Sequence, residues 1–357
     1  MDAKNDDGDT ALIIAAKNGL CEDIMILLRG RADIEAAGQY GNTALMVAAF
    51  EGHEQVLTML IKKGADIEAT NDHGDTALIR AAYHNQDKAI AILLFHGAKI
   101  EASNMSGEVA LIKAAHFGSY DAVVALLEGG ADTESVDRCG NTALLKSIGN
   151  DANFGMNNLH VVDLLLHNGA NIEAANMDER TALMKAAFSG KETVALSLLR
   201  KGVKIDAADT NGVTALILAA WNGKERIVKI LLEHKADVKA TTTDGTTALM
   251  KAAAIGSVHI VKLLLDKGAD IEAADHTGLT AIEVAAFYDK EEVLELLLQR
   301  RDNLHDTIIG KKALERTLGA DHIDVVARLA EAGGKMHSAT STSESAALTA
   351  ASDSGSE

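Results

Sequence analysis

The sequence predicts an all-α solenoid built from repeated helix pairs. Nine motifs of the type Thr-Ala-Leu are in register, and their third residues are Leu12, Leu45, Leu78, Leu111, Leu144, Leu183, Leu216, Leu249 and Ile282. The interval is 33 residues except for one step of 39. Composition agrees, because none of the 357 residues is proline and only 3% are aromatic, which suits close-packed helices of alanine and leucine. A fixed period favours a stacked array over a single large core.

Each unit is expected to begin with a helix capped by threonine. A hydroxyl at this place can accept a hydrogen bond from the free N–H groups of the first turn. The threonines are Thr10, Thr43, Thr76, Thr142, Thr181, Thr214, Thr247 and Thr280. Val109 takes the same place in the fourth unit, so that helix is predicted to lack a side-chain cap.

Alanine pairs, leucine pairs and a glycine then follow in a fixed order within each unit. Alanine pairs such as Ala48-Ala49 keep the first helix thin, and leucine pairs such as Leu93-Leu94 give the second helix an apolar face. A glycine such as Gly64 ends that helix in a left-handed conformation. Arg31 and Lys235 replace this glycine and are predicted to be left-handed at a cost of about 1 kcal/mol each.

The order of turn, Thr-Ala-Leu, Ala-Ala, Leu-Leu and Gly-Ala-Asp-Ile-Glu-Ala resembles the ankyrin repeat family over residues 1 to about 335. The resemblance implies an ankyrin-repeat solenoid: helix-turn-helix pairs with hairpin loops, about nine full repeats and a degenerate C-terminal capping repeat. The family's usual Thr-Pro-Leu-His opening has changed, and an apolar residue stands in place of histidine at Ile13, Met46, Ile79, Ile112, Met184, Ile217 and Met250. We therefore expect packing there instead of a polar network.

The predicted domain layout has three parts. An ankyrin repeat domain covers residues 1–335, and its fifth repeat carries an insertion loop near 149–158. The capping repeat lies around Ala313-Leu314 to Gly333, and Glu283 is expected to place charge toward solvent near this end. Residues 336–357 are rich in Ser, Thr and acids without periodicity, which predicts a disordered tail.

Charge and cysteine content restrict the classes of partner and cell compartment. The formal net charge of −18 argues against nucleic-acid or anionic-membrane binding, because both select a basic face. Neither a signal peptide nor a transmembrane segment is predicted, which favours a cytoplasmic setting with a nuclear one as the alternative. Cys21 and Cys139 are far apart in the sequence, so neither a disulfide nor a metal site is expected.

No enzyme signature is found in the sequence. It lacks a phosphate-binding loop, a His-Glu-x-x-His motif, a Cys-x-x-Cys pair and a Gly-x-Ser-x-Gly turn. The glycines are periodic helix stops, and the thirteen histidines are scattered. The sequence therefore predicts a protein that is not an enzyme and needs no cofactor.

Aromatic residues concentrate at one place in the repeat. The resemblance implies that the hairpin tips and the exposed end of each first helix form a concave binding face, as in ankyrin arrays. Seven of the eleven aromatics follow the alanine pairs, and an eighth is at a hairpin tip: Phe50, Tyr83, Phe117, Phe188, Trp221, Phe287, Tyr288 and Tyr40. Rigid rings bury much area at low entropic cost, so these residues are predicted to bind a partner. The alternative is that some rings pack against the next repeat and stiffen the stack.

Charged residues form two further rows. Just before the alanine pairs lie Arg80, Lys113, Lys146, Lys185 and Lys251, a cationic row suited to acidic side chains or a C-terminal carboxylate. An acidic row follows the second helices at Glu35, Glu68, Glu101, Glu134, Glu173 and Glu272, with Asp206 at the equivalent place. The alternative interpretation is that the two rows neutralise each other and keep the protein soluble.

These patterns lead to a functional prediction. We expect a protein-protein interaction scaffold or adaptor, monomeric on its own, that binds a partner protein through the aromatic ladder and the cationic row. A structural spacer or assembly element, acting through its ends and length, is a second hypothesis. A regulator that occludes a partner enzyme is a third, and no sequence feature separates it from the first.

Overall fold

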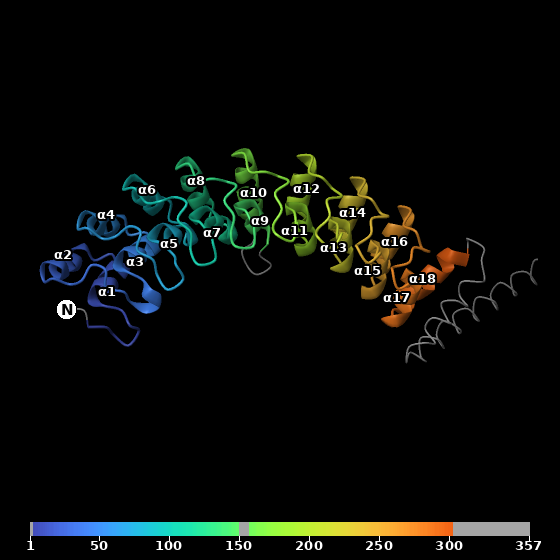
Figure 1. Ribbon diagram of the computed structural model, residues 1–357, viewed down its shortest axis with the longest axis horizontal. Helices are drawn as coiled ribbons and strands as arrows, with labels where there is room; N and C mark the ends of the chain where they lie inside the picture. The colour runs from blue at the N-terminus through green and yellow to red at the C-terminus, as the bar shows by residue number, and fades with distance from the viewer. Residues whose placement is uncertain (1–2, 150–156, 303–357) are drawn as a thin grey trace, which may run out of the picture. The chain divides into compact units, whose positions relative to one another are not determined.

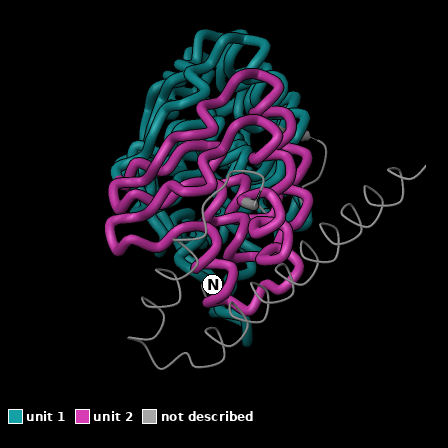
Figure 2. Tube along the Cα trace, turned by 90° about the vertical axis from the view of Figure 1, so that its right-hand side faces the viewer, with its two compact units in different colours: residues 1–210 teal, residues 211–357 magenta. Residues whose placement is uncertain are grey.

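The computed structural model describes residues 3–149 and 157–302, which form α-helices in consecutive pairs (Figure 1). The predicted capping repeat, the predicted tail and most of the predicted insertion lie outside the described residues. The chain divides into two compact units, Met1–Thr210 and Asn211–Glu357 (Figure 2). Among the described residues, extended structure is limited to isolated β-bridges such as Lys4 with Thr10.

The first unit contains six helix pairs. Its first helices are α1 (Ala11–Lys17), α3 (Ala44–Glu51), α5 (Ala77–Tyr83), α7 (Ala110–Phe117), α9 (Ala143–Ile148) and α11 (Ala182–Ser189). Its second helices are α2 (Cys21–Arg29), α4 (Glu54–Lys62), α6 (Asp87–Phe95), α8 (Tyr120–Glu128), α10 (Asn157–His167) and α12 (Glu192–Arg200). Each first helix contacts the first helix of the next pair, and the second helices do the same. Figure 1 shows the two sets as separate layers of this unit.

The second unit repeats this arrangement. Its first helices are α13 (Ala215–Trp221), α15 (Ala248–Ile255) and α17 (Ala281–Phe287), and its second helices are α14 (Glu225–Glu233), α16 (Val258–Asp266) and α18 (Glu291–Asp302). Helix α15 contacts both α13 and α17, while α16 contacts both α14 and α18. Each pair therefore packs mainly on its neighbours, as a repeat protein requires.

Threonine caps begin the first helices as predicted. The hydroxyl of Thr76 accepts a hydrogen bond from the Ile79 N–H at 3.4 Å, and the same bond forms at Thr10, Thr43, Thr142, Thr181, Thr214 and Thr247. Val109 makes no side-chain cap on α7, which confirms the predicted exception. The free backbone N–H groups at the start of α7 therefore lack the threonine hydroxyl that accepts a hydrogen bond in the neighbouring repeats.

The core of each unit is made of small and aliphatic side chains. The alanine pairs are fully buried, for example Ala81 and Ala82. The residues that replace the family's histidine are also buried, with Ile79 and Ile112 at 0% exposure, so packing replaces a polar network there as predicted. Close contact between first helices follows from the alanines, because a side chain of one carbon lets two helices approach.

Left-handed residues end the second helices where predicted. Gly64 has φ 91° and open space where a Cβ would stand, so glycine is needed there for its backbone conformation alone. Arg31 and Lys235 adopt the same region, with φ of 65° and 68°. Arg31 and Lys235 therefore adopt the strained left-handed conformation, and the turn after the helix is kept.

Backbone hydrogen bonds join each hairpin to the next. In the first unit, the N–H of Asp72 donates to the carbonyl of Tyr40 and the N–H of Met105 donates to that of His73, both at 3.0 Å. In the second unit, the N–H of Thr243 donates to the Asn211 carbonyl at 2.8 Å. Asx turns shape several hairpins, as at Asn71, whose Oδ1 accepts from the N–H groups of His73 and Asp75.

One sequence prediction is corrected by the structure. Glu283 does not place charge in solvent: it is 3% exposed, and its carboxylate accepts from the Thr280 N–H at 2.9 Å and from the Thr280 hydroxyl. It acts as the glutamate of a capping box at the start of α17.

Candidate binding surface

The predicted aromatic residues occupy equivalent places at the ends of the first helices. Tyr83 is the last residue of α5 and Phe117 the last of α7, while Trp221 and Phe287 close α13 and α17. Phe50 and Phe188 lie one residue before the ends of α3 and α11, and Tyr288 caps α17. Each ring follows a buried alanine pair directly or one residue later, so the packed helix fixes where the ring leaves the repeat.

In the second to fourth repeats the rings stack on one another. The centroids of Phe50 and Tyr83 are 5.9 Å apart with planes at 19°, and Tyr83 meets Phe117 edge-on at 4.4 Å. His84, which follows Tyr83, stacks on Phe50 at 4.2 Å, and its Nδ1 lies 3.0 Å from the Phe50 carbonyl oxygen. Phe50, Tyr83, His84 and Phe117 form what we call the aromatic cluster. Its three predicted rings are half-buried, because each covers part of the next.

Arg80 belongs to this cluster and not to an open basic surface. Its guanidinium carbon lies 4.5 Å from the centroid of Phe50 and 5.8 Å from that of Tyr83, so the cation rests on two ring faces. Burial lowers the pKa of Arg80 from its usual value, although the Asp75 carboxylate opposes the shift. The Arg80 Nε is buried and has no hydrogen-bond partner.

The remaining predicted aromatics are open to solvent. Phe188 is 44% exposed, Trp221 50%, and Tyr40, Phe287 and Tyr288 fall between 48% and 60%. Trp221 has the Nζ of Lys251 4.4 Å from its ring centroid, and Phe287 meets Tyr288 edge-on at 5.0 Å. Tyr40 lies in the short 3₁₀ helix Gln39–Gly41, on a hairpin, with its ring 6.2 Å from that of His73. Large exposed rings of this kind are available for contact with another molecule.

Two of the five predicted cations are neutralised inside the first unit. The Nζ of Lys113 lies 2.9 Å from Glu108, and the Nζ of Lys146 lies 3.1 Å from Glu108 and 2.9 Å from Asp137. Burial alone would raise the pKa of Glu108 and of Asp137, but the hydrogen bonds from these lysines outweigh it and lower both. The pKa of Lys146 is raised against the effect of burial by the same two carboxylates.

Lys185 differs from these two lysines. Within the part of the chain that the structure describes, no carboxylate lies within ion-pair distance of its Nζ. Its side chain is half-buried, and burial together with repulsion from Lys146 lowers the pKa of Lys185. His116 lies in the same positive environment, because burial and then Lys146 lower the pKa of that imidazole.

The acidic row has a structural role. The Oε1 of Glu35 accepts from the Asp66 N–H at 2.8 Å, and Glu68 accepts from the Lys99 N–H at the same distance. Equivalent bonds join Glu101 to Asp132, Glu134 to Asn171 and Glu173 to Lys204, while Glu272 pairs with Arg301. The first five of these glutamates therefore hold the backbone of the following repeat, and among the described residues no ion pair joins the glutamates of the acidic row to the cationic row.

Three residues of this surface were missed by sequence reasoning. His84 was set aside with the scattered histidines, and Glu108 and Asp137 belong to neither predicted row. Their signal is positional: Glu108 lies five residues before Lys113, and Asp137 lies nine before Lys146, at the base of the hairpin that precedes each helix. A search for opposite charges at fixed offsets within the repeat would have found both acids.

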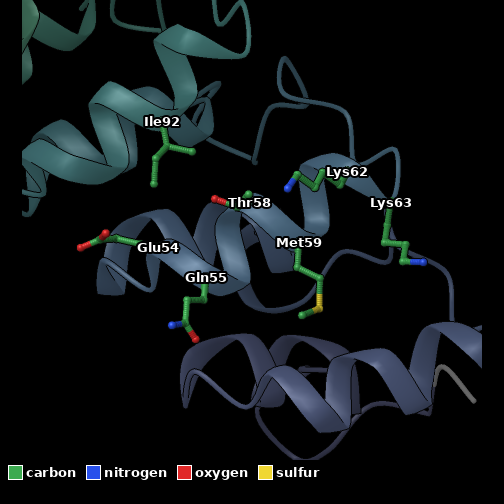
Figure 3. Close-up of a pocket in the computed structure, with 7 residues that line it drawn as sticks. All are labelled: Glu54, Gln55, Thr58, Met59, Lys62, Lys63 and Ile92. Atoms are coloured by element: carbon green, nitrogen blue, oxygen red, sulfur yellow. The ribbon is translucent and has the colours of Figure 1, made fainter.

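A surface hollow lies elsewhere in the first unit. It has a volume of about 630 Å³ and is lined by Glu54, Gln55, Thr58, Met59, Lys62, Lys63 and Ile92 (Figure 3). These side chains come from the second helices α4 and α6 and the turn after α4. None of the predicted binding residues contributes to it.

Two further classes of site were sought in residues 3–149 and 157–302. No helix there combines the length and the apolar character needed to cross a membrane. The same residues contain no group of three or more His, Cys, Asp or Glu side chains arranged to hold a metal ion.

Comparison with known proteins bears on the whole array. A family model described as ankyrin repeats in three copies matches residues 1–71, 78–176, 151–242 and 235–308. A search of curated proteins found no match. The matched segments cover well over half of the 357 residues and coincide with the helix pairs described above. With the repeat period, the threonine caps and this match in agreement, the chain belongs to the ankyrin repeat family.

Proposed function

We propose that the chain is a scaffold or adaptor that binds a partner protein at the ends of its first helices, through aromatic anchors flanked by lysine and arginine. Ankyrin repeats are protein-protein interaction modules and are typically not enzymes. The observation that carries the proposal is the exposure of Phe188 and Trp221, 44% and 50%, at equivalent places in α11 and α13. A partner that covers the exposed part of these rings would remove further apolar area from water, which favours binding.

The proposed roles differ along the set. Phe188 and Trp221 are the anchors, because their open rings can be desolvated by a partner. Tyr40, Phe287 and Tyr288 extend the contact on the hairpin and near the last described repeat. Phe50, Tyr83 and Phe117 already cover one another, so in this proposal they contribute a rigid edge with Arg80, Lys113 and Lys146. Lys185 and Lys251 are the cations that remain beside open rings.

The experiment compares two variants with matched chemistry. A protein with both Phe188→Ala and Trp221→Ala should lose partner capture in a pull-down, since each anchor contributes about 2 kcal/mol, or a factor of about 30 in affinity. Phe95→Ala removes an aromatic that is 85% exposed but lies at the end of the second helix α6, so it should leave capture unchanged.

Circular dichroism serves as the folding control, because none of these three rings belongs to the core. Photo-crosslinking residues placed at Phe188 and at Phe95 identify the contacting face directly, and crosslinks are expected only from the first position. Equal capture by wild type and by the double variant would reject the proposed anchors.

A further inference from the structure

Lys185 occupies the same place in its repeat as Lys146 does in the one before. Each is the fourth residue of its first helix, α11 for Lys185 and α9 for Lys146. Lys146 is held by two carboxylates, Asp137 from its own repeat and Glu108 from the preceding repeat. Because the backbone positions are equivalent, the surroundings of the two amines can be compared residue by residue.

Two repeat positions supply an acid to Lys146. The residues at the equivalent positions for Lys185 are both asparagines. Asn176 lies nine residues before Lys185, as Asp137 lies nine before Lys146, and Asn141 is the equivalent of Glu108 one repeat later. The Asn176 Oδ1 accepts from the N–H groups of Asp178 and Arg180 at 3.1 and 3.0 Å, and its Nδ2 donates to the Asn141 Oδ1 at 3.3 Å. These amides keep the hairpin geometry but carry no charge.

The other charges near Lys185 are mostly positive. Lys146 and Arg180 both lower the pKa of Lys185, and the carboxylate that opposes them most, Asp137, is already bound to Lys146 at 2.9 Å. Arg180 stands where Glu108 stands in the fourth repeat, and its Nε lies 3.4 Å from Asp209. The sixth repeat therefore keeps a half-buried amine while the acids that accompany its equivalents are gone.

A partly exposed aromatic ring lies on the same helix as this amine. Phe188 follows Lys185 by three residues on α11, and residues three apart share one side of a helix. The ring is 44% exposed. Among residues 3–149 and 157–302, Lys185 has no carboxylate at ion-pair distance, and the Phe188 ring on the same helix is partly exposed. In the second to fourth repeats the rings stack on one another, Arg80 lies over Phe50 and Lys113 pairs with Glu108.

We propose that Lys185 and Phe188 form a subsite for a partner segment in which an Asp or Glu stands next to a bulky apolar residue. The partner's carboxylate accepts a hydrogen bond from the Lys185 Nζ and takes the place that Asp137 fills beside Lys146, while the apolar side chain covers the Phe188 ring. Charge complementarity selects the acid, since the subsite is locally cationic in a chain of net charge −18. The inference rests on the proposed function and specifies its partner.

The probe is a library of short random peptides displayed on phage and selected against the full chain. Enriched peptides should carry an acid adjacent to an aromatic or large aliphatic residue. A synthetic copy of the most enriched peptide, measured by fluorescence anisotropy, should bind about tenfold more weakly when its acid is changed to the corresponding amide, because a charge-assisted hydrogen bond is lost.

Two protein variants test the subsite from opposite directions. Lys185→Met removes the charge and keeps the length of the side chain, and should weaken the acidic peptide about tenfold. Asn176→Asp installs the carboxylate that Asp137 gives to the fifth repeat; it should pair with Lys185 from within and weaken the peptide to a similar extent. Lys201→Met, an exposed lysine at the end of α12, is the matched control and should not change affinity.

The outcomes separate this inference from the proposed function. Peptides without acid enrichment, or affinities equal for wild type, Lys185→Met and Asn176→Asp, would overturn the subsite. If such peptides still lose binding with Phe188→Ala, the proposed binding surface stands without its acidic preference. If the selected peptides bind the Phe188→Ala and Trp221→Ala variants as tightly as they bind the wild type, the proposed function fails as well. Urea unfolding of every variant excludes loss of fold as the cause.

Discussion

The second to fourth repeats and the sixth repeat use the same positions in different ways. In the second to fourth repeats, Phe50, Tyr83 and Phe117 stack in succession, Arg80 rests on two rings and Lys113 is paired with Glu108. In the sixth repeat, the ring of Phe188 is open and Lys185 has asparagines where Lys146 has acids. The comparison shows that the position in the repeat determines where a side chain leaves the helix. The neighbouring side chains determine whether it is covered or exposed to a partner.

The largest expected effect separates the two lysines. Lys146→Met leaves the carboxylates of Glu108 and Asp137 without their shared cation, and should lower the free energy of unfolding by about 3 kcal/mol. Lys185→Met removes an amine that burial and Lys146 already disfavour, and should lower it by less than about 0.5 kcal/mol. Urea unfolding followed by circular dichroism measures both. Equal losses would show that the two lysines have equivalent surroundings after all.

The aromatic positions should divide in the same manner. Phe50→Ala removes a ring that contacts Tyr83, His84 and Arg80, and should cost about 2 kcal/mol of folding free energy. Phe188→Ala removes a ring that is 44% exposed and should cost less, about 1 kcal/mol or below. Thermal and urea unfolding test the pair, and a larger loss from Phe188→Ala would contradict the distinction between stacked and open rings.

Acid titration gives a smaller difference with a definite sign. The pKa values of Glu108 and Asp137 are lowered in the folded state, so their ion pairs contribute stability above the unfolded pKa values, near 4.5 and 3.8. That contribution is lost as pH falls through the lowered folded values. Between about pH 5 and 3 the wild type should lose about 1 kcal/mol more than Lys146→Met. Parallel pH dependences of the urea midpoint would contradict the pairing.

The smallest predicted effect concerns the uncapped helix of the fourth repeat. Val109→Thr preserves the shape of a residue that is 6% exposed and adds a hydroxyl that can accept from the Ile112 N–H. Because the neighbouring repeats make this bond at 3.4 Å, the variant should gain about 1 kcal/mol. Thr76→Ala is the reciprocal control and should lose a similar amount in the same urea assay.

The fold could be predicted from the sequence because the repeats share the same local helix-capping, packing and helix-ending residues. Threonine before Ala-Leu, buried alanine pairs and a glycine after the second helix each act within a few residues, so the period alone places them. Glu283 was assigned to solvent because charge is normally exposed, but its distance of three residues from Thr280 made it a capping-box partner. A local rule would have identified that role.

The candidate surface could be predicted only in part. The repeat places Phe50 and Phe188 at equivalent helix ends, but whether a ring is stacked depends on the residue one repeat away. The same holds for Lys146, one of whose two carboxylates, Glu108, belongs to the preceding repeat. Such contacts between repeats depend on side-chain geometry, which composition and spacing do not contain.

The carboxylates of the acidic row give the stack a direction. Glu35, Glu68 and Glu101 each accept a hydrogen bond from an N–H group 31 residues later, so the acceptor lies in the earlier repeat each time. Removing a later repeat would leave a carboxylate that water can solvate, whereas removing an earlier repeat would take the acceptor away from a backbone that remains. Unravelling of the first unit should therefore proceed more readily once its leading repeat is lost than once its trailing repeat is lost.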